Sequence, residues 1–261
     1  MKTKLIFTSL VLTALPALAG PPPAAPAAPP PVSDSGWTFR MAPYLWAQGL
    51  DGTMGVRGLT GDVNLDFSDI ASDLDFAYMG AFEARHGRWG IMTDINYAET
   101  SDNIDTHEMF FSGGDFKMKQ FLGNVTLNYR VVETDTTVLD LYAGARLNWV
   151  DLGISLDRPV ALRAEASNTV SRSGDEFWAD AIVGARFQTS LGGPWFFRAS
   201  GDIGGGDSDL TWQAMGLIGY KISDTCNVGL GYRTLSTDYK NGGFTYDITA
   251  SGPILGAEWR W

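Results

Sequence analysis

The chain has 261 residues, which is enough for one sizeable domain, and it carries a formal net charge of −11 with a pI of about 4.5. This balance excludes nucleic acid as a partner, because binding to phosphates needs clustered lysine and arginine. Cys226 is the single cysteine of the sequence, so no internal disulfide can form.

The N-terminal region predicts export. Residues 1–19 combine two lysines, a short apolar stretch and a small-residue cleavage site that ends at Ala19, which is the pattern of a secretory signal peptide. Residues 20–36 are rich in proline and alanine and predict an extended periplasmic spacer without a core of its own. No later stretch is apolar for long enough to cross a bilayer as a helix. If the chain enters a membrane, it therefore has to do so as a closed β-barrel.

From residue 37 to residue 261 the sequence alternates between apolar and polar residues, with Gly, Asp and Asn between the alternating runs. This texture predicts an all-β domain, an antiparallel up-and-down barrel of ten transmembrane strands, with eight or twelve strands as alternatives. The ten predicted strands are residues 37–50, 75–85, 88–100, 115–131, 137–156, 176–190, 194–203, 209–222, 226–238 and 244–261.

The first connection holds further signals. Residues 53–67 alternate weakly, and they predict either a hairpin inside the loop or part of another strand pair. The stretch FSDIASDL, which follows, predicts one helical turn capped by Ser68 or Asp69.

The connections alternate between two kinds along the chain. Short ones lie near residues 85–90, 131–137, 190–195 and 223–227. Long or polar ones are residues 51–75, 101–115, 157–176, 203–209 and 238–243. Short turns at one end and long loops at the other are typical of bacterial outer-membrane barrels. Both termini are then expected on the periplasmic side.

One face of the predicted strands carries nearly balanced arginines and acids. Arginine, rather than lysine, suits packed and desolvated ion pairs, because its planar guanidinium can donate two parallel hydrogen bonds to a carboxylate. We therefore interpret this face as the barrel interior, filled by an ion-pair network. The predicted network consists of Arg40, Glu83, Arg85, Asp94, Asp140, Arg146, Asp180, Arg186, Arg198, Asp202, Arg233, Glu258 and Arg260.

The opposite face is apolar, with Trp and Tyr near the strand ends, as in the aromatic girdles of membrane barrels. A soluble sandwich with aromatic strands is the competing interpretation. The chain ends in GPILGAEWRW, whose apolar face runs unbroken to the last residue. With the signal peptide and the hairpin plan, this terminal strand resembles the small bacterial outer-membrane barrels of the OmpA, OmpX and OmpW type. The resemblance implies that Leu255, Ala257, Trp259 and Trp261 form the signal read by the barrel assembly machinery.

Ten strands enclose little more than side chains, so the predicted lumen is a plug of ion pairs, and a narrow channel for small solutes is the alternative. The expected role is structural or surface interaction, in contact with outer-membrane lipid and lipopolysaccharide. An outer-membrane enzyme is a second alternative and would use His107, which lies near Asp102, Asp105 and Glu108. His86 falls in a turn on the periplasmic side, the wrong end for such a site. No catalytic, cofactor-binding or metal-binding residue is predicted.

Overall fold

A computed structural model describes residues 36–56, 59–104, 113–157 and 169–261 of the chain. The barrel belongs to one compact unit, Asp34–Trp261. The predicted signal peptide, the predicted spacer up to residue 35 and His107 lie outside the described residues, so they stay predictions.

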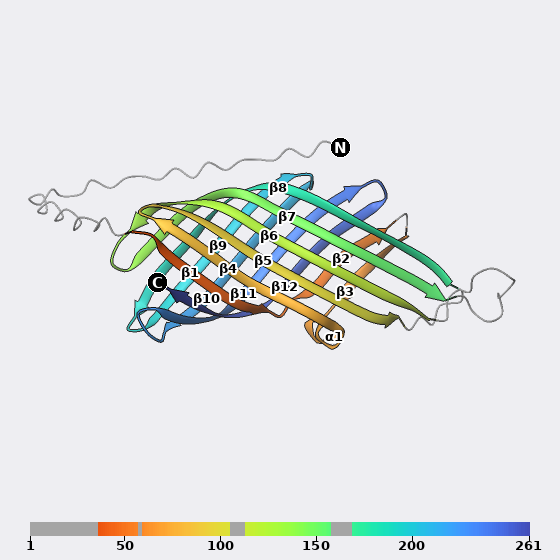
Figure 1. The fold of residues 1–261 in the computed structure, drawn as a ribbon, viewed down its shortest axis with the longest axis horizontal. Coiled ribbons are helices and arrows are strands. Elements are labelled where there is room, and N and C mark those ends of the chain that lie inside the picture. The colour runs from red at the N-terminus through yellow and green to blue at the C-terminus, as the bar shows by residue number, and fades with distance from the viewer. Residues whose placement is uncertain (1–35, 57–58, 105–112, 158–168) are drawn as a thin grey trace, which may run out of the picture. The chain divides into compact units, whose positions relative to one another are not determined.

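Twelve strands and one short helix make up the described chain (Figure 1). They are β1 (Thr38–Trp46), β2 (Gly49–Val56), β3 (Leu59–Leu65), α1 (Phe67–Ser72), β4 (Leu74–His86), β5 (Trp89–Ile104), β6 (Gly113–Glu133), β7 (Thr137–Asp157), β8 (Thr169–Gly192), β9 (Trp195–Gly206), β10 (Leu210–Lys221), β11 (Cys226–Asn241) and β12 (Phe244–Arg260).

All neighbouring strands are antiparallel, and ten of them close into a ring. The order runs from β1 through β4 and β5 to β12, and the pairing of β1 with β12 completes the circle. The closing register pairs Arg40 with Arg260 and Leu45 with Leu255. The predicted ten-stranded, antiparallel barrel is thereby confirmed.

The two additional strands form a hairpin inside the first connection. Strand β1 ends at Trp46. Strand β2 then pairs with the part of β12 that β1 does not cover, where Gly49 is opposite Ser251 and Gly55 is opposite Thr245. Strand β3 then pairs with β2. The weak alternation at residues 53–67 is therefore a hairpin, which was one of the two predicted alternatives.

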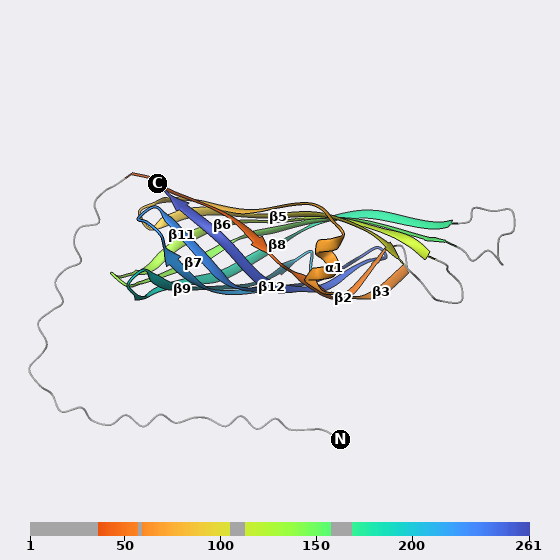
Figure 2. The same ribbon diagram turned by 90° about the horizontal axis from the view of Figure 1, so that it is seen from below.

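Helix α1 is a short helix of six residues between β3 and β4, and Figure 1 shows it at the edge of the barrel, with Figure 2 giving the view from below. Its N-cap is Asp66, and the Asp69 carboxylate accepts a hydrogen bond from the Asp66 N–H at 3.1 Å. The predicted cap at Ser68 or Asp69 was wrong, because the helix begins at Phe67 and both residues lie in its first turn. Among the described residues no helix is long and apolar enough to span a membrane.

The connections at the end of the barrel that holds Trp261 are tight turns, as predicted; we call this the terminal end and the opposite one the distal end. Two of the distal connections predicted to be long or polar are also tight. Strands β11 and β12 run to Asn241 and Phe244, and only Gly242 and Gly243 separate them, with φ of +54° and +93°. Both values lie in the left-handed region, which glycine adopts without strain.

The outside of the ring is apolar between two aromatic rows. In the distal row, five aromatic side chains of β4 to β8 are direct cross-strand neighbours: Tyr78, Tyr97, Phe121, Trp149 and Phe177. The terminal row includes Trp89, Tyr129, Trp195, Tyr220, Trp259 and Trp261. From Phe121 to Tyr129 a tilted strand covers roughly 20 Å of the barrel axis, close to the apolar band of outer-membrane barrels. Exposed side chains between the rows, such as Ile91, Val183 and Leu230, match the predicted outer face.

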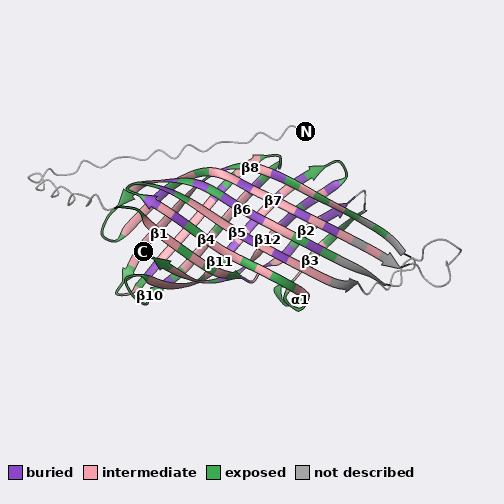
Figure 3. Cartoon of the chain, viewed as in Figure 1, coloured by how far each residue is buried: buried purple, intermediate pink, exposed green. Residues whose placement is uncertain are grey.

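Beyond the distal row the polarity of the two strand faces is reversed: polar residues point outward and apolar residues point inward. On β7 the outward positions turn from Leu147 and Trp149 to Asp151, while the inward positions turn from Arg146 to Val150. Figure 3 shows buried residues continuing into this part of the barrel. We call it the distal dome. It comprises β2, β3 and the described parts of β6, β7, β8, β11 and β12 beyond the distal row, residues 113–120, 150–157, 169–176 and 234–251.

The distal dome has a hydrophobic core inside the barrel, which extends past the distal row to Trp46, Leu122, Trp178 and Ile254 of the spanning part. Strand β2 pairs with β12 and also contacts β8, so its side chains lie between the two. The buried core residues are Trp46, Leu50, Met54, Val56, Met118, Leu122, Val150, Leu152, Trp178, Leu235, Tyr239, Phe244, Tyr246, Ile248, Ala250 and Ile254. The polar face of the strands was predicted to point inward, and for the dome this prediction was wrong, because its interior is apolar.

Candidate functional site

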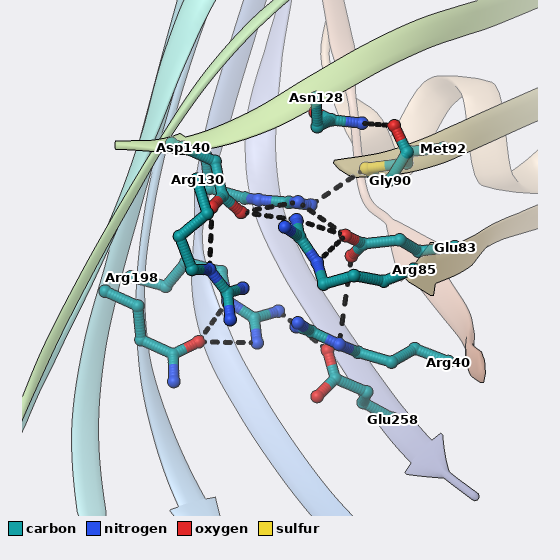
Figure 4. Close-up of polar contacts among 12 residues, drawn as sticks. Arg40, Glu83, Arg85, Gly90, Met92, Asn128, Arg130, Asp140, Arg198 and Glu258 are labelled. Atoms are coloured by element: carbon teal, nitrogen blue, oxygen red, sulfur yellow. Dashed lines mark hydrogen bonds and ion pairs between the residues drawn. The ribbon is translucent and has the colours of Figure 1, made fainter. Parts of the chain in front are cut away.

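The candidate site is the polar part of the lumen, between the terminal end and the distal dome. Its lower part, the terminal cluster, comprises Arg40, Glu83, Arg85, Arg130, Asp140, Arg186, Arg198 and Glu258 (Figure 4). Asp140 lies at its centre and accepts hydrogen bonds from Arg85 at 2.7 Å, Arg130 at 3.0 Å and Arg186 at 3.2 Å. One buried carboxylate thus joins four strands, because β4, β6, β7 and β8 supply these side chains.

Two glutamates extend the terminal cluster across the lumen. Glu83 accepts hydrogen bonds from Arg85 at 2.6 Å and from Arg186 at 3.1 Å, and Arg40 lies 3.8 Å away. Glu258, on the closing strand β12, pairs with Arg198 at 2.9 Å. The cluster therefore ties the first strands of the ring to the last.

The upper part of the polar lumen, the central cluster, contains two further arginine–aspartate pairs, Arg233–Asp94 and Arg146–Asp202. Arg233 lies 2.9 Å from Asp94, donates to the Tyr44 hydroxyl at 3.0 Å, and stands over the Trp46 ring at 4.7 Å. The pair with Asp94 crosses the lumen from β11 to β5, whereas Tyr44 and Trp46 are on β1, which is separated from β11 only by β12.

Arg146 is the most deeply buried charge of the lumen, with 0% of its surface exposed. Its guanidinium donates to Asp202 and to the Thr211 hydroxyl at 2.7 Å each and to the Asn124 side chain at 3.0 Å. All three of its nitrogens therefore have partners. A buried arginine satisfied in this way is held rigidly, and removing one partner leaves a desolvated charge.

The structure places eleven of the thirteen predicted network residues in these two clusters: Arg40, Glu83, Arg85, Asp94, Asp140, Arg146, Arg186, Arg198, Asp202, Arg233 and Glu258. The other two lie elsewhere. Asp180 accepts hydrogen bonds from the Ser208 N–H and hydroxyl, both at 2.8 Å, and so fixes the β9–β10 connection. Arg260 is exposed at the rim and donates to the Asp224 carbonyl at 3.0 Å.

Sequence reasoning missed one charged member and the neutral ones. Arg130 faces inward in step with Asn124 and Asn128, so the alternation of β6 carried its signal. The neutral partners are Tyr44, Asn124, Tyr142, Gln188, Thr211, Gln213 and Asn227. Nothing in the sequence distinguishes these side chains from other polar residues of the strands.

The two histidines and the cysteine were the other candidate residues of the sequence. His86 lies at the terminal end with its ring 5.4 Å from that of Trp37, while His107 lies outside the described residues. Cys226 is a free, partly buried thiol. In the described ranges no group of three or more His, Cys, Asp and Glu side chains is arranged to hold a metal ion.

The residues of the predicted assembly signal, Leu255, Ala257, Trp259 and Trp261, lie on β12 or directly after it. Leu255, Trp259 and Trp261 are exposed on the outer face, and the Trp261 ring lies 6.0 Å from that of Phe39 on β1. The signal thus lies along the seam where the barrel closes. Its recognition by assembly machinery stays a prediction.

Comparison with known proteins found no matching family model and no matching curated protein. Similar solved structures include Ail, the attachment invasion locus protein of Yersinia pestis, at 12% identity and a TM-score of 0.30, covering 87% of this chain and 99% of that one. Neisserial surface protein A aligns at 12% identity and 0.32, covering 86% and 99%. The translocator domain of autotransporter NalP from Neisseria meningitidis aligns at 10% identity and 0.37, covering 88% and 90%. TM-scores this low support no conclusion about this chain.

The class of the protein follows from its own architecture. Ten strands close the sheet, so the ring itself leaves no unpaired edge at the closing seam. Its outer face is apolar between two aromatic rows, while ionised side chains are buried inside. A soluble barrel has the reverse polarity, because water surrounds it. The chain is an integral outer-membrane β-barrel.

Proposed function

We propose that the protein is a non-conducting outer-membrane barrel that presents its distal dome at the cell surface for contacts with partners. The membrane-spanning part serves as an anchor. The dome is the part that meets other molecules.

The observation that supports this proposal is the hydrophobic core of the dome. Trp178 is 1% exposed and stacks on Tyr239 with ring centroids 4.3 Å apart, and the rings of Tyr246 and Phe244 lie 5.3 Å and 6.4 Å from it. A dry, packed core of this kind leaves no continuous water path from the polar lumen to the distal end. The narrow channel, the predicted alternative, would have to open this core.

The outer face of the dome supports a surface role. Its outward positions are small hydroxyl side chains and acids, such as Thr234, Ser236, Asp238, Thr249 and Asp247 on β11 and β12. The paired strands keep these side chains in fixed register. A hydrophilic, pre-ordered surface loses little conformational entropy when it binds.

Planar-bilayer recording of the full mature barrel tests the closed lumen. We expect no steady unit conductance from the wild type. Trp178→Ala combined with Tyr239→Ala should produce discrete conducting events, because it removes the stacked pair at the centre of the seal. The matched control is Trp212→Ala, since Trp212 lies on the outward face of β10. Steady unit conductance of the wild type would overturn the proposal.

The orientation needs its own measurement. In a Cys226→Ser background, single cysteines at Ser173 and Thr53 in the dome should react with a membrane-impermeant maleimide on intact cells. A cysteine at Asp135, in the β6–β7 turn at the terminal end, should react only after the outer membrane is permeabilised. The opposite labelling pattern would place the dome in the periplasm and contradict the surface role.

We also propose that the surroundings of the barrel are those expected from sequence, outer-membrane lipid with lipopolysaccharide, and that the barrel assembly machinery reads the β12 signal. Support comes from the exposed aromatic side chains at the seam, Trp259 and Trp261. Deleting Trp261 should lower the amount of folded barrel in the outer membrane without changing in-vitro refolding into detergent.

A further inference from the structure

A cavity of about 160 Å³ lies inside the lumen between the terminal and the central cluster. A cavity of about 150 Å³ in another protein is large enough for a benzene molecule. This one has two kinds of wall. Met92, Phe196, Met215 and Leu217 line it with apolar atoms. Arg186, Arg198 and Glu258 line it on the side of the terminal cluster, and Arg233, Asp94 and Asp202 line it on the side of the central cluster. Each of these three carboxylates already has an arginine partner.

The charges around the cavity are unequal. In the central cluster each arginine has its aspartate, Arg233 with Asp94 and Arg146 with Asp202. In the terminal cluster five arginines meet three buried carboxylates, and Glu133, 44% exposed at the rim and paired with Arg130, makes a fourth. The described residues therefore leave at least one buried positive charge uncompensated beside the cavity. A buried charge of this kind attracts an anion.

Two guanidinium groups show where partners are missing. The Arg40 Nε atom is buried and has no hydrogen-bond partner among the described residues. Arg186 directs Nη1 at the Met92 sulfur, 2.9 Å away, as Figure 4 shows by the dashed line to Met92. A thioether is a weak acceptor, so this N–H group is available to a stronger one. Arg186 also lines the cavity, so the available donor lies at the cavity wall.

We propose that this cavity binds a small organic anion, a carboxylate with an apolar body the size of one aromatic ring. The carboxylate accepts a hydrogen bond from Nη1 of Arg186, and the ring packs against Met92, Phe196 and Met215. An organic cation would add to the excess positive charge. A neutral molecule of the same shape would leave the arginines without an acceptor. The hydrophobic core of the dome blocks the distal side, so the ligand enters from the terminal end.

Binding can be measured on the full folded barrel in phosphate-free detergent micelles, with 4-fluorobenzoate as the probe and its ¹⁹F signal as the readout. Empty micelles correct for partitioning. We expect saturable binding of 4-fluorobenzoate, about tenfold weaker binding of 4-fluorobenzyl alcohol, and none of 4-fluorobenzylamine, since only the carboxylate pairs with guanidinium. Absence of saturable 4-fluorobenzoate binding would overturn the proposal, and so would equal affinity for the alcohol. Displacement by inorganic phosphate at equal concentration would also overturn it, because the apolar wall would then contribute nothing.

Two variants assign the binding to the cavity. Arg186→Gln should weaken binding by about tenfold, because it removes a charged donor. Ala42→Leu should abolish it by filling the space, since Ala42 lines the cavity without a polar contact. Arg260→Gln, at the rim, is the matched control and should bind as the wild type does. Gel mobility without heating reports whether each barrel is folded. If Arg186→Gln does not fold, Ala42→Leu alone decides, and full binding by that variant would contradict the assignment.

Discussion

The membrane-spanning part of the barrel and the distal dome are built from the same strands but have opposite polarity. On β12 the outward residues of the spanning part include Leu255 and Trp259, and those of the dome are Thr249 and Asp247. The inward residues change in the opposite sense, from Glu258 to Tyr246 and Ile248. The strand continues through this change without a break in its pairing.

The difference shows that the solvent determines which face of a strand is apolar. Lipid surrounds the spanning part, so its apolar face is outside and its charges pair with one another inside. Water surrounds the dome, and its apolar face is buried, as in a soluble sandwich. The register of a strand is therefore set by two environments at once. A slip by one residue would expose charges to lipid in one part and core residues to water in the other.

The largest loss of stability is expected in the spanning part, at the shared carboxylate of Asp140. Asp140→Ala leaves three arginines of the terminal cluster without their shared acceptor, and it should lower the free energy of unfolding by about 3–5 kcal/mol. Urea titration in lipid vesicles, followed by tryptophan fluorescence, measures this change. Asp135→Ala in the exposed turn is the control and should change stability by less than about 0.5 kcal/mol. Equal effects of the two substitutions would show that the cluster contributes no net stability.

Two arginine substitutions on β8 test the change of environment directly. Val183 and Ser173 both point outward on this strand, Val183 between the aromatic rows and Ser173 in the dome. Val183→Arg should cost about 2–4 kcal/mol, because it places a charge in the apolar band, whereas Ser173→Arg should cost about 0–1 kcal/mol. The same vesicle titration measures both. Similar costs at both positions would mean that the apolar band reaches into the dome.

The architecture of the spanning part could be predicted from sequence because its signals are local. Alternation, turn residues and the preference for arginine over lysine all lie within single strands, and they predicted the ten strands and the sidedness of residues such as Arg146 and Leu141. The hairpin at residues 53–67 was visible only as weak alternation. Its position beside β12 depends on the pairing of residues almost two hundred positions apart, Gly55 with Thr245.

The site could be predicted only in part, because alternation gives the face of a residue and not its height or its partner. Asp180 and Arg260 were grouped with the network for their face alone, yet one fixes a connection and the other lies at the rim. The reversal of polarity was missed for a related reason. An inward Val150 and an outward Asp151 contradict the pattern of the rest of the strand when it is taken from sequence alone. In the structure they follow Trp149, whose aromatic row marks the edge of the membrane.

A smaller loss of stability is expected at Thr211, whose neutral hydroxyl supports the central cluster. Thr211 is fully buried, accepts a hydrogen bond from Arg146 at 2.7 Å and donates to the Ser236 carbonyl at 3.0 Å. Thr211→Val keeps the volume but removes both bonds, so it should lower the free energy of unfolding by about 1–3 kcal/mol. Thr234→Val is the matched control, since Thr234 is on the outward face of β11. A loss no larger than that of the control would mean that the other partners of Arg146 suffice.

The smallest loss of stability is expected at helix α1. Asp69→Ala removes the acceptor for the Asp66 N–H at the start of α1 and should release this turn locally, because α1 has no fully buried residue and only Ile70 of the helix packs, partly buried, against the dome core. The global free energy of unfolding should change by about 0.5 kcal/mol or less, while amide exchange in residues 66–73 should become faster. Ser68→Ala alters the same turn but keeps the Asp69 carboxylate, and it should leave that exchange unchanged. If Asp69→Ala also speeds exchange in β2, the helix stabilises the dome as well as its own turn, and the boundary between the two regions extends further than their polarity indicates.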